Sequence, residues 1–211
     1  MPRFVSYISN GIYDIGCTGQ TVYVYDKNGT ELAKFKDLTY IYYAAISPRG
    51  DIFVAKSTEG RLAVYSLETL SLIKKFRFSN VNYAQDDGFC FSADGKYFIN
   101  LERQGDDLHS VISVYDTADF SRVSQFSFGD GGMVFDIEQV DGEFYVHGFW
   151  RDADLIMPEN FVAKYKDGKI CESFHITENE HAYYNELFLK KRRGETGTDH
   201  TLATLWQSYA T

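Results

Sequence analysis

Two pairs of adjacent carboxylates, Asp86-Asp87 and Asp106-Asp107, are the residues of this sequence best suited to acid–base or metal chemistry. Acidic loops suit Ca²⁺, which takes many oxygen ligands. The D-x-D-x-D-G spacing of a calcium loop is absent, however, and the side chains of adjacent aspartates point apart, so we expect no metal there. Carboxylates that face each other across a channel mouth could also act as general acid and base in a glycosidase.

The histidines and cysteines show no spacing that predicts a metal site. No H-x-H or H-x-x-x-H pattern occurs among the histidines, which are His109, His147, His175, His181 and His200. The cysteines are scattered, and we interpret them as buried, reduced thiols of a cytoplasmic protein: Cys17, Cys90 and Cys171. Since no G-x-S-x-G elbow, phosphate-binding loop or dinucleotide fingerprint occurs, we expect no cofactor.

The charge balance argues against nucleic acid as the main partner. The chain of 211 residues has 21 Lys and Arg against 30 Asp and Glu, a formal net charge of −9 at pH 7. Its basic runs, Lys74-Lys75 and the four residues at 190–193, are typical of solvated turns. No apolar stretch has the length of a membrane span and no leader peptide is recognisable, so we expect no membrane partner.

A repeated strand–turn–strand unit organises the chain. The turns end in glycine at intervals of about 40 to 50 residues, the period of propeller repeats. These glycines are Gly11, Gly50, Gly95, Gly142 and Gly194. A second hairpin follows each of the first four units, and its first strand carries Tyr25, Tyr65, Tyr115 or Tyr165. Alternating apolar residues and turns such as Asp-Lys-Asn-Gly at 26–29 predict antiparallel hairpins.

Four antiparallel strands per repeat predict an all-β fold, a β-propeller of about five blades with the last one incomplete. A sheet that is apolar on both faces needs a neighbour on each side, which stacked blades provide. We expect a single domain over residues 1–211, with blades at about 3–37, 41–78, 86–128 and 132–175 and a partial blade at 183–211. A β-sandwich would have short strands as well, but not this fixed repeat.

Short motifs in the repeats resemble those of the WD40-like and YVTN-type β-propeller superfamily. They are Val-Tyr-Asp at 24–26 and 114–116, Ser-Pro-Arg-Gly at 47–50 and Ser-Ala-Asp-Gly-Lys-Tyr at 92–97. The resemblance covers most of residues 3–175, but the Gly-His and Trp-Asp dipeptides of WD40 repeats are missing. We therefore do not expect the hydrogen-bond tetrad of WD40 blades. The resemblance implies a binding platform more often than an enzyme, and no particular ligand.

The fifth unit is incomplete in this interpretation. One strand is expected near Tyr183 and a second at 201–206, shortly before the sequence ends. One hypothesis is that the exposed edge of this unit pairs with another copy of the chain, giving a homodimer, or with residues outside the sequence. The alternative is a ring closed within one chain by a thin last blade.

The loops expected around the central channel give the candidate binding residues, because insertions on one face mark a variable surface. The predicted face is acidic and rich in aromatic residues. Its candidates are Tyr42, Tyr83, Asp86, Asp87, Arg103, Asp106, Asp107, His109, Trp150, Arg151, Asp152 and His181. An exposed Trp150 beside Arg151 is the best single candidate. In the alternative interpretation, Trp150 folds back onto the fourth blade. Tyr40 lies in the same set of loops.

Three functional hypotheses remain open from the sequence. The first is a cytoplasmic, non-enzymatic propeller that binds a protein or peptide through this face. The second is a small-molecule hydrolase of the lactonase or glycosidase type, with carboxylates at the channel mouth. The third is part of a larger propeller assembly with no site of its own.

Overall fold

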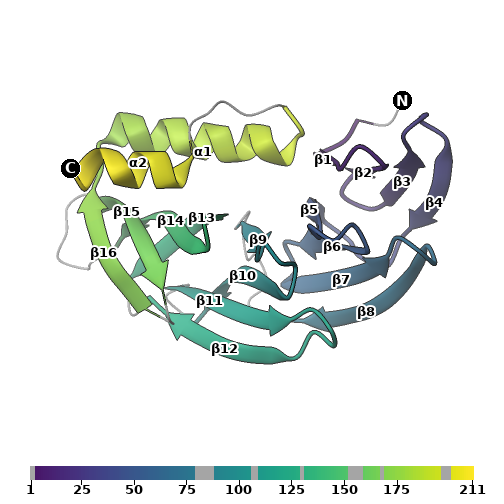
Figure 1. Cartoon of the computed structure of the whole chain (residues 1–211), viewed down its shortest axis with the longest axis horizontal. Coiled ribbons are helices and arrows are strands. Elements are labelled where there is room, and N and C mark those ends of the chain that lie inside the picture. Colours follow the sequence, from purple (N-terminus) through teal and green to yellow (C-terminus); the bar gives the residue numbers. More distant parts are fainter. Residues whose placement is uncertain are drawn as a thin grey trace. The chain divides into compact units, whose positions relative to one another are not determined.

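The computed structural model describes residues 3–78, 88–105, 109–128, 131–151, 159–166, 169–195 and 201–211. Within them the strands form four sheets of four antiparallel strands, each sheet built from consecutive strands of the chain (Figure 1). This confirms the predicted all-β architecture of four-stranded, blade-like sheets.

Two compact units share the chain, one made of Met1–Asp86 and Leu189–Thr196 and the other of Asp87–Phe188 and Gly197–Thr211. That the whole chain is one propeller domain stays a prediction. No helix in the described part of the chain is long and apolar enough to cross a membrane.

The first unit contains two sheets. The first comprises β1 (Ser6–Ser9), β2 (Tyr13–Cys17), β3 (Val22–Asp26) and β4 (Glu31–Phe35). The second comprises β5 (Ile41–Ile46), β6 (Ile52–Ser57), β7 (Arg61–Ser66) and β8 (Ser71–Arg77). The two sheets share one core, in which Ile15 and Val24 of the first pack with Ala44, Phe53 and Tyr65 of the second.

The second unit also contains two sheets. One comprises β9 (Phe89–Phe91), β10 (Tyr97–Gln104), β11 (His109–Asp116) and β12 (Arg122–Ser127). The other comprises β13 (Gly132–Val140), β14 (Glu143–Trp150), β15 (Glu159–Lys166) and β16 (Lys169–His175). Their shared core joins Leu101 and Ile112 of the first sheet to Val146, Phe161 and Tyr165 of the second.

The Ser-Ala-Asp-Gly-Lys-Tyr motif at 92–97 is the turn between β9 and β10. The Ser92 hydroxyl donates to Asp94 Oδ1 (2.6 Å) and accepts from the main-chain N–H of Tyr97 (2.8 Å). The N–H of Lys96 also donates to Asp94 Oδ1 (2.9 Å). Gly95 has φ +67°, a conformation that glycine adopts without steric cost. The motif therefore fixes the turn through local side-chain hydrogen bonds.

The predicted fifth blade is wrong, because its segment forms two helices, α1 (Glu178–Arg192) and α2 (Leu202–Tyr209). Helix α1 begins with a capping box, in which the Thr177 N–H donates to Glu180 Oε2 (2.9 Å) and the Glu180 N–H donates to Thr177 Oγ1 (3.2 Å). Helix α2 begins at the N-cap Thr201, which accepts from the Thr204 N–H (3.1 Å). The described residues of this segment therefore contain no strand edge of the kind that one hypothesis paired with another copy of the chain.

The helices cover one face of the sheet β13–β16 (Figure 1). Tyr184 and Leu187 of α1 and Leu202 and Leu205 of α2 pack with Tyr145 and Val162 of the sheet. Because these apolar residues recur three or four positions apart, they fall on one side of a helix. A sheet that is apolar on both faces thus buries its second face under helices rather than under another sheet.

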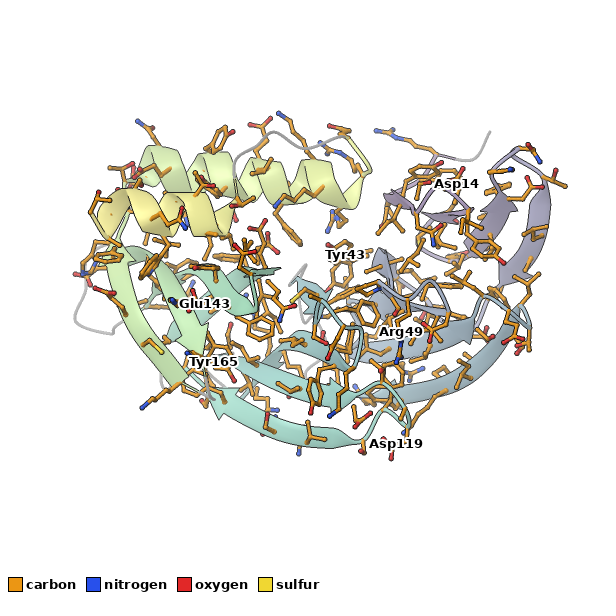
Figure 2. The ribbon with its side chains drawn as sticks, viewed as in Figure 1. Asp14, Tyr43, Arg49, Asp119, Glu143 and Tyr165 are labelled. Carbon is orange, nitrogen blue, oxygen red and sulfur yellow. The ribbon has the colours of Figure 1, made fainter. Side chains whose placement is uncertain are left out.

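One charged contact borders this packing. The ammonium of Lys164 forms an ion pair with Glu143, which also accepts from the Tyr145 hydroxyl (3.0 Å). The Lys164 Nζ lies 5.3 Å from the centroid of the Trp206 ring. Figure 2 labels Glu143 beneath the two helices. The contact ties α2 to β14 and β15 by charge as well as by apolar area.

Candidate functional site

Most of the predicted site residues that the structure describes are buried or half-buried. Those it covers are Tyr42, Arg103, His109, Trp150, Arg151 and His181. The others lie outside the described residues: Tyr83, Asp86, Asp87, Asp106, Asp107 and Asp152. The acidic part of the predicted face therefore stays a prediction.

A β-bulge between Val134 and Asp136 shapes the end of the sheet β13–β16. Asp136 pairs with His147, and Met133 pairs with Phe149, so these four residues share one face of the sheet. Bulges re-aim side chains and are common beside functional sites. Here the bulged residue Phe135 lies with its ring centroid 5.3 Å from that of Phe149.

An aromatic cluster, which we call the His147 cluster, forms where helix α1 crosses this face. It consists of Phe135, His147, Phe149 and His181. The His181 ring centroid lies 4.7 Å from that of His147, 5.7 Å from Phe135 and 6.3 Å from Phe149. Both phenylalanines and His181 are half-buried, whereas His147 is fully buried. His181 was expected on a loop, but it belongs to α1.

A chain of hydrogen bonds sets the proton positions in the cluster. The Asn185 amide Nδ2, which can only donate, lies 3.1 Å from His181 Nε2. The proton of His181 is then on Nδ1, which donates to His147 Nε2 at 2.9 Å. His147 keeps its own proton on Nδ1, and this buried atom has no hydrogen-bond partner among the described residues.

Burial keeps both imidazoles neutral. Desolvation, helped by repulsion from His181, lowers the pKa of His147 to about 3. Desolvation also lowers the pKa of His181, although the nearby Glu178 carboxylate opposes that shift. At neutral pH the pair is therefore an uncharged hydrogen-bonding unit, and each imidazole uses a ring nitrogen to bind the other.

Two arginines border the cluster. The guanidinium carbon of the buried Arg103 lies 5.6 Å from the centroid of the Phe135 ring, and its NH2 group donates to the carbonyl of Val134 (3.3 Å). The guanidinium carbon of the exposed Arg151 lies 5.8 Å from the Phe149 ring centroid. Cation–π contacts of this kind hold the guanidinium over the ring.

Trp150 lies on the opposite face of the sheet, because successive strand residues alternate. It is half-buried, and its ring stacks on Phe161 with 4.9 Å between centroids and approaches Phe128 at 6.3 Å. The expectation of an exposed Trp150 beside Arg151 is therefore wrong, and the alternative in which it covers its own sheet describes its packing.

Two further predicted residues lie away from the cluster. Tyr42 is only 5% exposed on β5, in the first unit, and the Arg192 guanidinium carbon lies 5.6 Å from its ring centroid. His109 is half-buried at the start of β11, where it pairs with Gln104. Neither residue belongs to the His147 cluster.

The loop between β4 and β5 in the first unit presents a second feature, the exposed Tyr40. The residue is 64% exposed, and its φ of +52° lies in the left-handed region that favours glycine. Holding a residue other than glycine there costs about 1–3 kcal/mol. In Figure 2, Tyr43 marks the strand β5 that follows this loop.

No metal centre is apparent in the part of the chain that the structure describes, since no group of three or more His, Cys, Asp or Glu side chains is placed to hold an ion. The sequence interpretation missed Phe135, His147 and Phe149 as site residues. The spacing of His147 and Phe149 two positions apart on a strand was a usable indication, because it places both on one face. No pattern in the sequence indicates the bulge at Phe135 as clearly.

The comparisons with known proteins support the fold. No family profile and no curated protein sequence matches the chain. Among solved structures, it is similar to hydrazine synthase of Kuenenia stuttgartiensis, with a TM-score of 0.67 and 18% sequence identity. The match covers 84% of this chain and 50% of that chain, so this chain spans about half the length of the protein it matches. At this identity the likeness concerns the propeller-like fold alone.

Proposed function

We propose that the chain is a non-enzymatic β-propeller scaffold that binds a protein or peptide segment through the exposed edge of the His147 cluster. The finer assignment of its repeats to the diverged WD40-like and YVTN-type superfamily is part of this proposal. The observation that carries the proposal is a preassembled aromatic pair, Phe135 and Phe149, beside the exposed guanidinium of Arg151.

The geometry of this edge suits recognition. Aromatic residues and arginine are enriched at the centres of protein interfaces, because they bring large contact area with few rotatable bonds. The backbone beneath them is fixed, since the N–H of Arg151 donates to the carbonyl of Gly131 (2.8 Å). A Cβ at Gly131 would lie 1.9 Å from the Arg151 carbonyl oxygen, so only glycine permits this approach. A fixed edge loses little entropy when a partner binds.

The neutral histidines support a binding role. Their ring nitrogens form hydrogen bonds with each other and with Asn185, and this arrangement holds α1 against β14. The pair thus serves to fix the position of the aromatic edge. The partner would contact the half-buried rings and Arg151, not the buried His147.

A displayed library of random peptides tests the proposal. We expect the purified chain to select peptides whose affinity, measured by fluorescence anisotropy, falls about tenfold in Arg151→Gln and in Phe149→Leu. Val123→Ala is the matched control, because Val123 is 52% exposed on β12, away from the cluster. Selected peptides that bind both cluster variants as tightly as the wild type would contradict the proposal, as would a shift in thermal midpoint with a panel of lactones or sugars but with no peptide.

A further inference from the structure

Tyr40 stands apart among the exposed apolar residues because its backbone is strained. The described residues other than glycine that have positive φ are Tyr40, Leu70, Phe120 and Asp141. Phe120 is 4% exposed and lies 6.0 Å from the Phe98 ring, and Leu70 packs against the core of the first unit. Asp141 is of a residue type that tolerates this conformation. In Phe120 and Leu70, therefore, burial offsets the strain.

No such burial offsets the strain at Tyr40. The residue is 64% exposed, and its ring makes no ring contact with any residue that the structure describes. Glycine or asparagine would adopt the same backbone conformation more easily. The fold of the first unit thus accounts for the shape of this loop, but not for the tyrosine side chain at its tip.

Hydrogen bonds on both sides of Tyr40 hold the loop in place. The carbonyl of Tyr40 accepts from the Thr58 N–H (3.1 Å), and the next N–H, of Ile41, donates to the carbonyl of Gly19 (2.8 Å). The Ser57 hydroxyl donates to the carbonyl of Thr39 (2.5 Å), and the Thr39 hydroxyl donates to Glu59 Oε2 (2.7 Å). The ring is therefore presented by a fixed backbone, with a carboxylate next to the preceding residue.

We propose that Tyr40 and Glu59 form a second recognition site, which receives a Lys or Arg side chain from a basic polypeptide segment. The face of a tyrosine ring attracts a cation, and the Glu59 carboxylate adds an opposite charge. The net charge of −9 draws a basic segment toward the chain and repels an acidic one. This site shares no residue with the His147 cluster, so the inference does not depend on the proposed function of that cluster.

Because the backbone of Tyr40 is strained, a single substitution can remove the ring without destabilising the loop. Asparagine tolerates positive φ, so Tyr40→Asn removes the ring without disturbing the loop. We expect its thermal midpoint to equal or exceed that of the wild type, whereas a structural tyrosine would lower the midpoint when removed. Tyr183→Ala is the matched control, because Tyr183 is an exposed tyrosine (42%) on a regular helix.

The experiment is a displayed library of random 12-residue peptides, selected on the wild-type chain and depleted on Tyr40→Asn. We expect the surviving peptides to be enriched in Lys and Arg and to bind about tenfold more weakly to Tyr40→Asn and to Glu59→Gln. Binding to Tyr183→Ala should be unchanged. Peptides without basic residues, equal binding to Tyr40→Asn, no surviving peptide, or a lowered midpoint of Tyr40→Asn would each overturn the inference.

The two proposals fail separately. Peptides that depend on Phe149 and Arg151 but not on Tyr40 would overturn this inference and leave the proposed function standing. Peptides that depend on Tyr40 and Glu59 alone would do the reverse.

Discussion

The two apolar faces of the sheet β13–β16 are buried in different ways. One face packs against the sheet β9–β12 through apolar side chains, among them Phe161 (1% exposed) and Val146 (0%). The other face packs under α1 and α2 and includes the buried His147, whose Nδ1 has no hydrogen-bond partner among the residues that the structure describes. Leaving a buried polar group without a partner costs about 1–3 kcal/mol. The repeat-to-repeat face is thus built for packing, whereas the helix-covered face also contains polar groups that packing alone does not require.

The largest expected effect compares equivalent truncations on the two faces. Leu101 on β10 is fully buried between sheets, and Leu187 on α1 is 5% exposed under the helix. We expect Leu101→Ala to lower the free energy of unfolding by about 3–5 kcal/mol and Leu187→Ala by about 2–3 kcal/mol. The difference arises because a helix can shift toward the cavity more easily than two hydrogen-bonded sheets can.

Urea unfolding measures both values. Val123→Ala serves as the exposed control and should stay within about 0.5 kcal/mol of the wild type. An equal or larger loss at Leu187 would show that the helix-covered face is packed as tightly as the face between the sheets.

The second prediction uses acid to act on the helix-covered face alone. His147 has a pKa of about 3 in the folded chain and about 6.5 when unfolded, so the unfolded state binds a proton first as the pH falls. The contribution of neutral His147 to the free energy of unfolding is complete above about pH 6.5. Below that value it is progressively lost, by about 2 kcal/mol between pH 7 and pH 5. The lowered pKa of His181 adds to the loss in the same range.

Urea unfolding at several pH values from 7 to 5 tests this, with His147→Phe as the comparison, since a phenylalanine cannot take up a proton. In that variant, the free energy of unfolding should fall less steeply as the pH is lowered. The carboxylates whose pKa is lowered in the folded state, such as Glu180, lose their contribution only at lower pH, so they do not confuse the result. If the free energy of unfolding of His147→Phe falls with pH as steeply as that of the wild type, other groups cause the loss of stability in acid.

The smallest of these effects concerns the start of α1. Thr177→Ala removes the hydroxyl that accepts from the Glu180 N–H, and the expected loss is about 1 kcal/mol. Hydrogen exchange should show the loss in the first turn of α1, while amides of β10 and β11 keep their protection. Thr177→Ser keeps the hydroxyl and is the matched control. Equal protection loss in β10 would indicate that the helix and the sheets unfold as one unit.

The sequence predicted the sheets well because each hairpin is encoded locally. Turn residues such as Asp94 and Gly95, with alternating apolar residues on either side, specify strand, turn and strand without distant information. The helices were missed although their marks were present. The Thr177-x-x-Glu180 capping box and the spacing of Tyr184, Leu187 and Phe188 both indicate a helix, but the repeat favoured a fifth blade.

The site was harder to predict, because its members come together only through packing. Arg103, Arg151 and His181 were among the predicted residues and do meet around Phe135 and Phe149. Trp150 was expected to be exposed in a loop, but it is the last residue of β14, and the pleat of that strand turns it to the face opposite Phe149. A composition-based choice of aromatic residues cannot determine which face of a strand each one occupies.

In each of the four sheets that the structure describes, the last strand along the chain lies at an edge, and this has a consequence for association in solution. The strands β4, β8, β12 and β16 each expose a charged side chain, namely Lys34, Lys75, Arg122 and Glu172. An edge strand offers unpaired main-chain groups to any other strand, and a charge placed on it opposes that pairing. Because the chain contains several sheets, each with such an edge, the tendency of edge strands to pair with other molecules arises in every sheet. These four charges therefore act less on folding than on keeping separate molecules from joining edge to edge at high concentration.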